Sequence, residues 1–102
     1  KPKIFIQVNI GNEIQKSGIS IDELESFIKS CRETYNLDVI GLMCIPPNDE
    51  KTNFYFNELN QLNKQFEFEE LSMGMSNDFI LAIDNGATSI RVGSKIFGKR
   101  IK

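Results

Sequence analysis

The chain of 102 residues contains no histidine. This absence excludes Ser-His-Asp and Cys-His catalysis, histidine-ligated zinc and imidazole acid–base chemistry within the chain. Any chemistry must therefore come from carboxylates, lysine, arginine, backbone amides or a cofactor. The two cysteines, Cys31 and Cys44, lack the spacing of a metal site. We expect both to be reduced core residues and no metal to be bound, which suits a cytoplasmic protein.

No stretch of the sequence resembles a signal peptide, basic residues are not in excess, and no apolar run approaches the about 20 residues that span a membrane. The net charge of −2 argues against a nucleic-acid-binding face. Length and ordinary globular composition predict one domain over residues 1–102. The chain has no initiator methionine and begins almost directly with a predicted strand, so we expect it to be the C-terminal part of a longer protein.

Predicted strands and helices alternate along the chain. The strands are predicted over residues 3–10, 37–45, 68–72 and 88–92. Helices are predicted to start at Ser20, at Asn48 or Asp49, and at residue 77, with one more starting in the turn after the last strand. Such alternation predicts parallel strands joined by right-handed crossovers.

Local signals indicate where the helices end and which sides they bury. Ser20 and Glu23 have the spacing of a capping box. Asn36 and Gly86 are expected just past two helix ends, in the left-handed conformation. The nearly continuous apolar run 37–45 predicts a strand covered on both faces. The spacing of apolar residues predicts the buried faces of the first two helices: Leu24, Phe27, Ile28, Cys31 and Tyr35, then Phe54, Tyr55, Leu59, Leu62 and Phe66.

Two turns that combine glycine with serine follow the last two predicted strands, at residues 72–76 and 91–94. Converging backbone N–H groups at helix N-termini, free of bulky side chains, favour a bound phosphate group. In the plainer interpretation, Gly74 and Gly93 form ordinary tight turns, and Ser76 and Ser94 only cap helices. The residues alone leave both interpretations open.

Two α/β architectures fit the pattern: a small open doubly wound sheet, or parallel (β/α) units forming half of a (β/α)8 TIM barrel. The barrel is favoured because such barrels often hold phosphate in the loops after strands seven and eight. If the four strands are the last four of a barrel, the chain is its C-terminal half and both turns lie there. Asn9, at the end of the first strand, is then expected to face the mouth of the barrel.

Three stretches, GLMCIP at residues 41–46, LSMGMSND at 71–78 and RVGSKIFG at 91–98, resemble the pyridoxal-phosphate homeostasis protein family. The segments QVN at 7–9 and KSG at 16–18 also match the pattern of this family. The resemblance spans essentially the whole chain, with the motifs in the right order. The family is related in fold to the N-terminal barrel of alanine racemase.

The resemblance implies a (β/α)8 barrel that carries pyridoxal 5′-phosphate at its C-terminal mouth and buffers or delivers it to dependent apoenzymes, without established catalysis. Arg91 would lie by the pyridine nitrogen. The family's Schiff-base lysine lies upstream of the matched part, so we expect this chain alone to hold phosphate weakly. The expected cofactor-binding residues are the phosphate contacts Ser72, Met73, Gly93 and Ser94, then Gly74 and Ser76 of the first turn, Arg91, and Asn9.

Three alternatives remain open. A racemase-like enzyme would need a second acid or base, and Tyr35 and Tyr55 are predicted on helices away from the mouth. A barrel enzyme for another phosphorylated metabolite is disfavoured by the lack of histidine and of a carboxylate at any predicted strand end. Finally, the chain could be a structural fragment, and open sheet edges predict some self-association.

Overall fold

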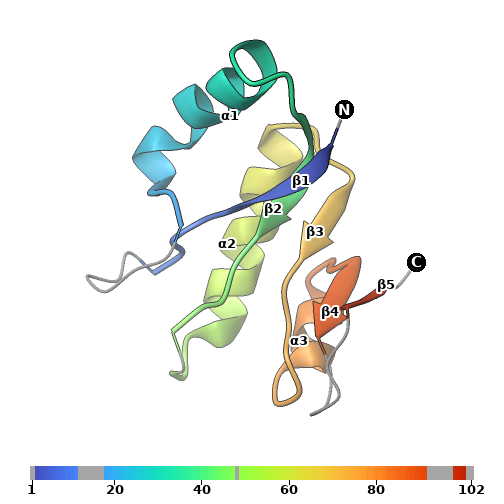
Figure 1. Ribbon diagram of the computed structural model, residues 1–102. Helices are drawn as coiled ribbons and strands as arrows, with labels where there is room; N and C mark the ends of the chain where they lie inside the picture. Colours follow the sequence, from blue (N-terminus) through green and yellow to red (C-terminus); the bar gives the residue numbers. More distant parts are fainter. Residues whose placement is uncertain (1, 12–17, 48, 92–97, 101–102) are drawn as a thin grey trace.

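The computed structural model describes residues 2–11, 18–47, 49–91 and 98–100. Its strands and helices alternate largely as the sequence predicts (Figure 1). In chain order, the elements are β1 (Lys3–Gln7), the 3-10 helix η1 (Ile21–Glu23), α1 (Leu24–Glu33), β2 (Asp38–Met43), α2 (Thr52–Gln65), β3 (Glu70–Ser72), α3 (Phe79–Asp84), β4 (Ser89–Arg91) and β5 (Gly98–Arg100).

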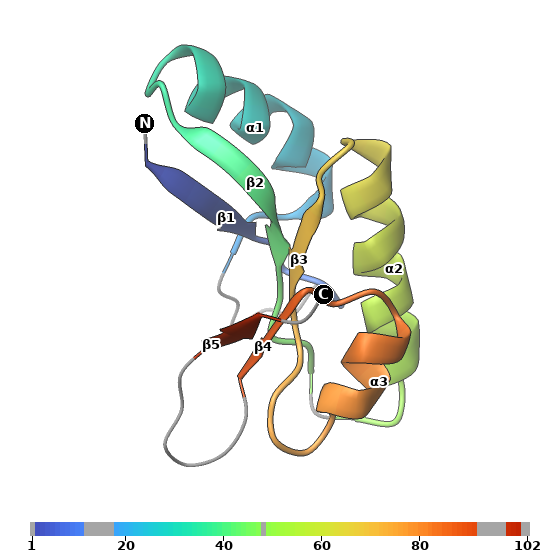
Figure 2. The ribbon, with the colours of Figure 1, turned by 90° about the vertical axis from the view of Figure 1, so that its right-hand side faces the viewer.

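The strands form one sheet in the order β1-β2-β3-β4-β5. The pairs from β1 to β4 are parallel, which confirms the α/β fold with a parallel sheet. Helices α1, α2 and α3 all lie on one side of the sheet, and the other side is open (Figure 2). A doubly wound sheet carries helices on both faces, so the described residues do not form one.

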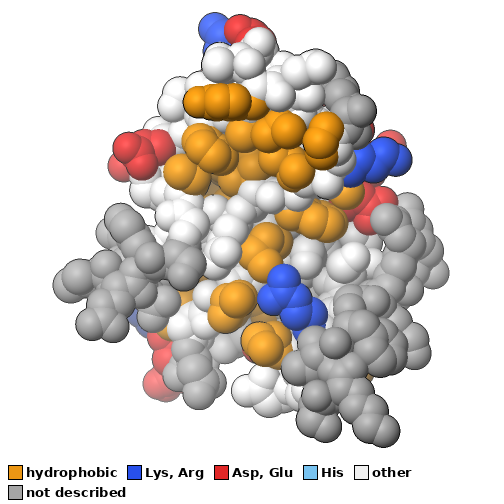
Figure 3. Space-filling view, in the orientation of Figure 1, with side chains coloured by type: hydrophobic (Ala, Val, Ile, Leu, Met, Phe, Trp, Pro, Cys, Tyr) orange, Lys and Arg blue, Asp and Glu red, His pale blue; other side chains and the backbone are white. Residues whose placement is uncertain are grey.

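The open side of the sheet overturns the prediction that residues 37–45 are covered on both faces. Leu42 is fully buried on the helix side, whereas Met43 is half-buried and Ile45 is 49% exposed. Figure 3 looks onto the open side, where hydrophobic side chains gather in a broad patch. Residues 37–45 therefore contribute side chains both to the buried core on the helix side and to the open side of the sheet.

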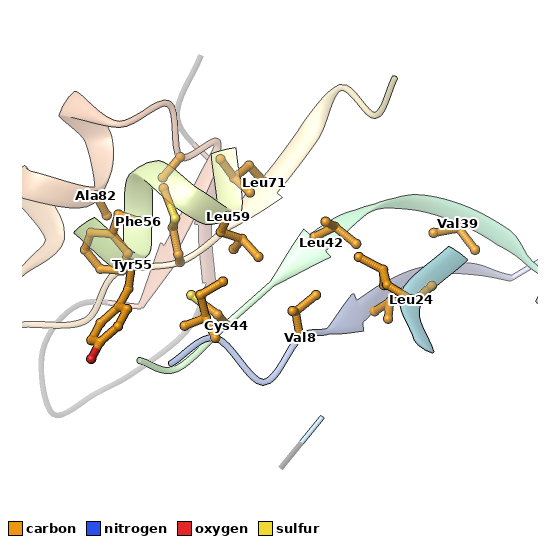
Figure 4. Packing of buried hydrophobic residues seen from close by; sticks show 14 of the residues in the cluster. Val8, Leu24, Val39, Leu42, Cys44, Tyr55, Phe56, Leu59, Leu71 and Ala82 are labelled. Atoms are coloured by element: carbon orange, nitrogen blue, oxygen red, sulfur yellow. The ribbon is translucent and has the colours of Figure 1, made fainter. Parts of the chain in front are cut away.

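The core lies between the sheet and the three helices. One cluster contains residues that are at most 1% exposed from every layer: Leu24 of α1, Leu42 of β2, Phe56 and Leu59 of α2, and Leu71 of β3 (Figure 4). Burial of apolar area, at about 25 cal/mol per Å², is the main source of stability for such a layer. The core thus holds the sheet from one side only.

The end of the chain differs from the prediction that a helix starts after the last strand. Residues 92–97 lie outside the described residues, and residues 98–100 form β5, which pairs antiparallel with β4 from Ser89↔Arg100 to Arg91↔Gly98. An edge strand presents unpaired backbone N–H and C=O groups, and β5 satisfies those of β4. Residues 98–100 are therefore a strand, and the helix start predicted in the turn after β4 lies outside the described residues.

The helix ends follow the local signals with one exception. Asn36 has φ +54° and Gly86 has φ +100°, which confirms both as left-handed residues past helix ends. Ser20 precedes η1, but its hydroxyl donates to the Glu23 carboxylate at 3.2 Å instead of accepting from a backbone N–H group. The capping box is therefore wrong in its hydrogen bonds, because the chain enters α1 through a 3-10 turn whose Glu23 N–H is bonded to the Ser20 carbonyl.

The buried face of α2 is rotated relative to the prediction. Phe54 is 60% exposed, whereas Phe56 and Asn63, which the apolar spacing did not select, are buried. The Asn63 amide accepts a hydrogen bond from Leu42 N–H at 2.9 Å and donates to the Glu70 carbonyl at 2.9 Å. One polar side chain thus bridges β2 and β3, where a side chain at Gly41 would overlap the Glu70 carbonyl.

Candidate functional site

The carboxyl ends of β2, β3 and β4 meet at one edge of the sheet. They enclose a hollow of about 10 Å³, which is room for a single water molecule. It opens among eight residues: Met43, Cys44, Ile45, Ser72, Met73, Gly74, Met75 and Arg91. Four of the expected cofactor-binding residues are therefore brought together here: Ser72, Met73, Gly74 and Arg91.

The turn after β3 is fixed by Gly74. This residue has φ +106°, a conformation that side chains rarely adopt, and a Cβ atom here would lie 2.7 Å from the Cβ of Ala82. Glycine thus lets the turn fold back closely over α3. The Met73 side chain is 3% exposed and belongs to the core, and its N–H group donates to the Ser89 carbonyl at 3.1 Å. Met73 therefore already uses its amide within the sheet.

The next residues of the turn form a closed pair of hydrogen bonds. Met75 N–H donates to Oδ1 of Asp78 at 2.7 Å, and Asp78 N–H donates to the Met75 carbonyl at 3.0 Å. Asp78 is the residue before α3, so the prediction that Ser76 caps this helix is wrong. Ser76 is exposed and lines a neighbouring groove between α2 and α3 together with Thr52.

Arg91 ends β4 beside this turn. Its N–H group donates to the Gly74 carbonyl at 2.9 Å, which ties the end of β4 to the turn after β3. The side chain is half-buried and lines the hollow with Ser72. A guanidinium group is always cationic in proteins, so the hollow combines a hydroxyl, a glycine turn and a fixed positive charge.

The remaining expected residues lie elsewhere. Asn9 follows β1 at the same end of the sheet and is 5% exposed, with its N–H group donating to the Ile19 carbonyl at 2.8 Å. It does not line the hollow. Gly93 and Ser94 lie outside the described residues, so the second half of the expected phosphate site has no described geometry.

Cys44 lines the hollow from the end of β2, where the sequence predicted only a core residue. It is 3% exposed and free, as Cys31 is, which confirms both as unpaired core cysteines. Burial, followed by the charge of Asp78, raises the pKa of the Cys44 thiol from 9.0 to about 12. The thiol therefore stays protonated at neutral pH and is a poor nucleophile.

Two predictions about acidic and phenolic groups need correction. A carboxylate does lie close to a strand end, because Asp78 in the turn after β3 influences Cys44 in the hollow. Tyr55 lies in the first turn of α2, near Gly11 after β1, and its hydroxyl donates to Asp49 at 3.3 Å. Tyr55 is therefore at the carboxyl end of the sheet, and only Tyr35 lies away from it. Tyr35 follows α1 and is 67% exposed, so its predicted place on the buried face of the first helix is wrong.

Asp78 is the functional candidate that spacing alone did not single out. The sequence signal was present, since Asp three residues after Met75 can accept from a turn amide. Within the described ranges, no three His, Cys, Asp or Glu side chains gather as a metal ion would require. Likewise, the described helices include none that is long and apolar enough to cross a membrane.

Comparison with known proteins identifies relatives along the whole chain. It is 40% identical over 106 residues to the pyridoxal phosphate homeostasis protein of Aquifex aeolicus, covering 95% of the chain and 46% of that protein. It is 41% identical over 113 residues to the protein of the same name from Caenorhabditis elegans, covering 96% of the chain and 46% of the relative. The chain thus spans about half the length of the curated relatives it matches.

The fold is similar to that of PipY from Synechococcus elongatus. The structure of PipY without pyridoxal phosphate aligns with a TM-score of 0.73 at 34% identity, and the structure with pyridoxal phosphate bound aligns with 0.68 at 33% identity. These alignments cover 95% of the chain and 50% and 49% of PipY. The expected resemblance is confirmed.

Residues 1–100 match the family described as alanine racemase, N-terminal domain. The match covers nearly the entire sequence and agrees with the parallel α/β sheet and with the relatives above. The chain therefore belongs to the alanine racemase N-terminal domain family.

Proposed function

We propose that the chain is a single domain over residues 1–102, the C-terminal half of a (β/α)8 barrel, that binds the phosphate group of pyridoxal 5′-phosphate in cytoplasmic cofactor homeostasis. The observation that carries this proposal is the meeting of Ser72, Gly74 and Arg91 in one hollow at the carboxyl ends of β3 and β4. Barrel sites lie at this end of the strands. The relatives' name and the PipY structure with pyridoxal phosphate bound support the choice of ligand.

The half-barrel proposal is supported by the one-sided sheet. In a barrel, helices cover only the outside of the strands, and the inside is filled by side chains from other strands. The described sheet has α1, α2 and α3 on one side and an apolar open side opposite them (Figures 2 and 3). The open side then corresponds to the barrel interior.

For phosphate, the turn 72–76 would supply the Ser72 hydroxyl and those backbone amides that Met73 and Met75 do not already use within the protein. The guanidinium of Arg91, proposed beside the ring nitrogen, would attract the dianion through its charge without contacting it directly. We propose that Gly93 and Ser94 of the second turn complete this contact, with Met73 and Ser76 flanking the first turn and Asn9 bordering the mouth. The hollow is far smaller than the cofactor, so the ring would rest above it, against the open side of the sheet.

We propose further that this domain does not catalyse a reaction. Pyridoxal phosphate supplies an electron-withdrawing ring when bound. A permanently cationic Arg91 beside the ring nitrogen would disfavour protonation of that nitrogen and so weaken this property. The Cys44 thiol, which lines the hollow, keeps its proton at neutral pH because burial and the charge of Asp78 raise its pKa. A racemase-like activity would require a group that exchanges protons readily at this point.

Binding should be tested with pyridoxine 5′-phosphate, which lacks the aldehyde and cannot couple to surface lysines. We expect amide shifts in residues 71–76 during an NMR titration, saturating in the millimolar range and absent with pyridoxine. Arg91→Gln should weaken the binding at least fivefold. Equal shifts with pyridoxine, or shifts elsewhere in the chain only, would contradict the proposal. Equal binding of inorganic phosphate would show a phosphate site without selectivity for the ring.

We also propose that the chain associates, either with itself or with dependent apoenzymes, through the open side of the sheet. An apolar groove of about 560 Å³ runs between β1 and α1 and continues this surface; Ile4, Phe5, Ile6, Phe27 and Leu37 line it. Sedimentation analysis should give a mass that increases with concentration. A monomer at all concentrations would contradict self-association.

A further inference from the structure

The turn after β3 contains its own negative charge. Oδ1 of Asp78 accepts the Met75 N–H group at 2.7 Å, which is short for an N–H···O bond and typical of a charged acceptor. The return bond, from Asp78 N–H to the Met75 carbonyl, is 3.0 Å. One of the backbone amides nearest the proposed phosphate position is therefore already bonded to a carboxylate.

The same turn is fixed from its other side by β4. The Gly74 carbonyl accepts from Arg91 N–H at 2.9 Å, and Met73 N–H donates to the Ser89 carbonyl at 3.1 Å. Among these hydrogen bonds of the described residues, only the one to Oδ1 of Asp78 involves a side chain. The others join backbone groups. A substitution at Asp78 can therefore loosen the turn and leave its attachment to β4 in place.

The charge of Asp78 opposes phosphate binding, whereas its hydrogen bond supports the turn that would bind the phosphate. Asp78 is half-buried and bonds the N–H group of Met75, which lines the hollow, and its charge contributes to the raised pKa of Cys44 there. A carboxylate at this position repels a phosphate dianion and offsets part of the attraction of Arg91. An asparagine would retain the accepting oxygen and remove the charge.

We propose that Asp78 is a positioning residue that fixes the shape of the turn 72–76 through the Met75 amide, and that its charge lowers the affinity of this turn for phosphate. This inference rests on the proposed function for its ligand. Asp78 thus acts through the backbone and does not itself hold the phosphate. Two substitutions of Asp78 distinguish these roles, because asparagine removes only the charge and alanine also removes the hydrogen-bond acceptor.

The test compares Asp78→Asn and Asp78→Ala, with Asp84→Asn as the control that removes the same charge from the other end of α3. Amide hydrogen exchange at Met75 should be unchanged in D84N, less than threefold faster in D78N, whose neutral acceptor is weaker, and at least tenfold faster in D78A. Pyridoxine 5′-phosphate should bind D78N about threefold more tightly than the unchanged chain at low ionic strength, with the difference vanishing in 1 M salt. D78A should bind several-fold more weakly.

Equal Met75 exchange in D78A and D78N would overturn the positioning role, as would equal phosphate affinity of these two variants. If no variant binds the phosphate but Met75 exchange follows the expected order, the proposed function fails and the positioning role stands. If D78A does not fold, as checked by its thermal unfolding, D78N decides alone. Looser phosphate binding by D78N, or Met75 exchange at least tenfold faster in D78N, would then overturn the proposal.

Discussion

The two sides of the sheet differ in what they contribute. The helix side carries fully buried Leu42 and Leu71, packed in one cluster with α1 and α2. The open side carries the half-buried Met43 and Ser72, and Arg91 lines the hollow together with them. Adjacent residues of the same strand therefore belong to different parts of the molecule: one set stabilises the fold, and the next presents chemistry to a ligand.

The largest effect that separates the two sides is expected for Leu59→Ala. Leu59 is fully buried on the helix side, and its truncation should lower the free energy of unfolding by about 2–5 kcal/mol through lost burial and a residual cavity. Ile45→Ala is the matched control, because Ile45 lies on the open side and is 49% exposed. It should change the free energy of unfolding by well under half as much. Urea unfolding measures both. Equal losses would mean that the open side is packed in solution, as in an oligomer.

Asn63→Ala should have the next largest effect. It removes the buried hydrogen bonds that Asn63 makes to the Leu42 N–H group and the Glu70 carbonyl, which should lower the free energy of unfolding by about 1–3 kcal/mol. Asn57→Ala, at an exposed position of the same helix, should change stability by less than about 0.5 kcal/mol. Similar values for both variants in urea unfolding would show that the bridge between β2 and β3 contributes nothing.

An effect that is absent at neutral pH and appears only at high pH is expected from Cys44. Its pKa is raised from 9.0 to about 12 on folding, so the folded chain keeps a proton that the unfolded chain has lost. The stabilisation is complete below pH 9 and falls by about 1.4 kcal/mol per pH unit as the pH rises toward 12. The difference in stability between the unchanged chain and Cys44→Ala should shrink over this range. A constant difference would contradict the raised pKa.

The smallest effect on stability is expected for Arg91→Gln. The Arg91 backbone bond to Gly74 is retained, and the side chain is only half-buried, so the unfolding free energy should change by less than about 0.5 kcal/mol. Phosphate binding should nevertheless weaken, as expected above. A large loss of stability in thermal unfolding would assign Arg91 to the scaffold and remove the distinction between the two sides.

Much of the fold could be predicted because its signals are local. Alternating apolar segments identified four parallel strands, and Asn36 and Gly86 ended helices where expected. The errors arose where partners distant in sequence decide the outcome. Phe56 in place of Phe54 reflects how α2 packs on the sheet, and the pairing of β5 with β4 depends on residues that are distant from any local helix signal.

The cofactor-binding role of the candidate site stays a prediction. Glycine and serine after β3 indicated a turn, and Gly74 has a φ of +106° there. Arg91, expected by the pyridine nitrogen, lines the hollow beside this turn. The sequence could not show that the turn amides are partly engaged, with Met73 N–H bonded to Ser89 and Met75 N–H to Asp78. Hydrogen-bond competition of this kind depends on exact backbone placement, which residue spacing does not encode.

Gly74 has a consequence for how the sequence can change over evolutionary time. A larger residue there meets two separate obstacles, a φ of +106° and the Cβ of Ala82 at 2.7 Å. Ala82→Gly would relieve the second obstacle and leave the first, because backbone strain does not depend on the neighbour. A compensating substitution at Ala82 therefore cannot make a larger residue at position 74 acceptable. We expect glycine to persist at this position even where Ala82 changes.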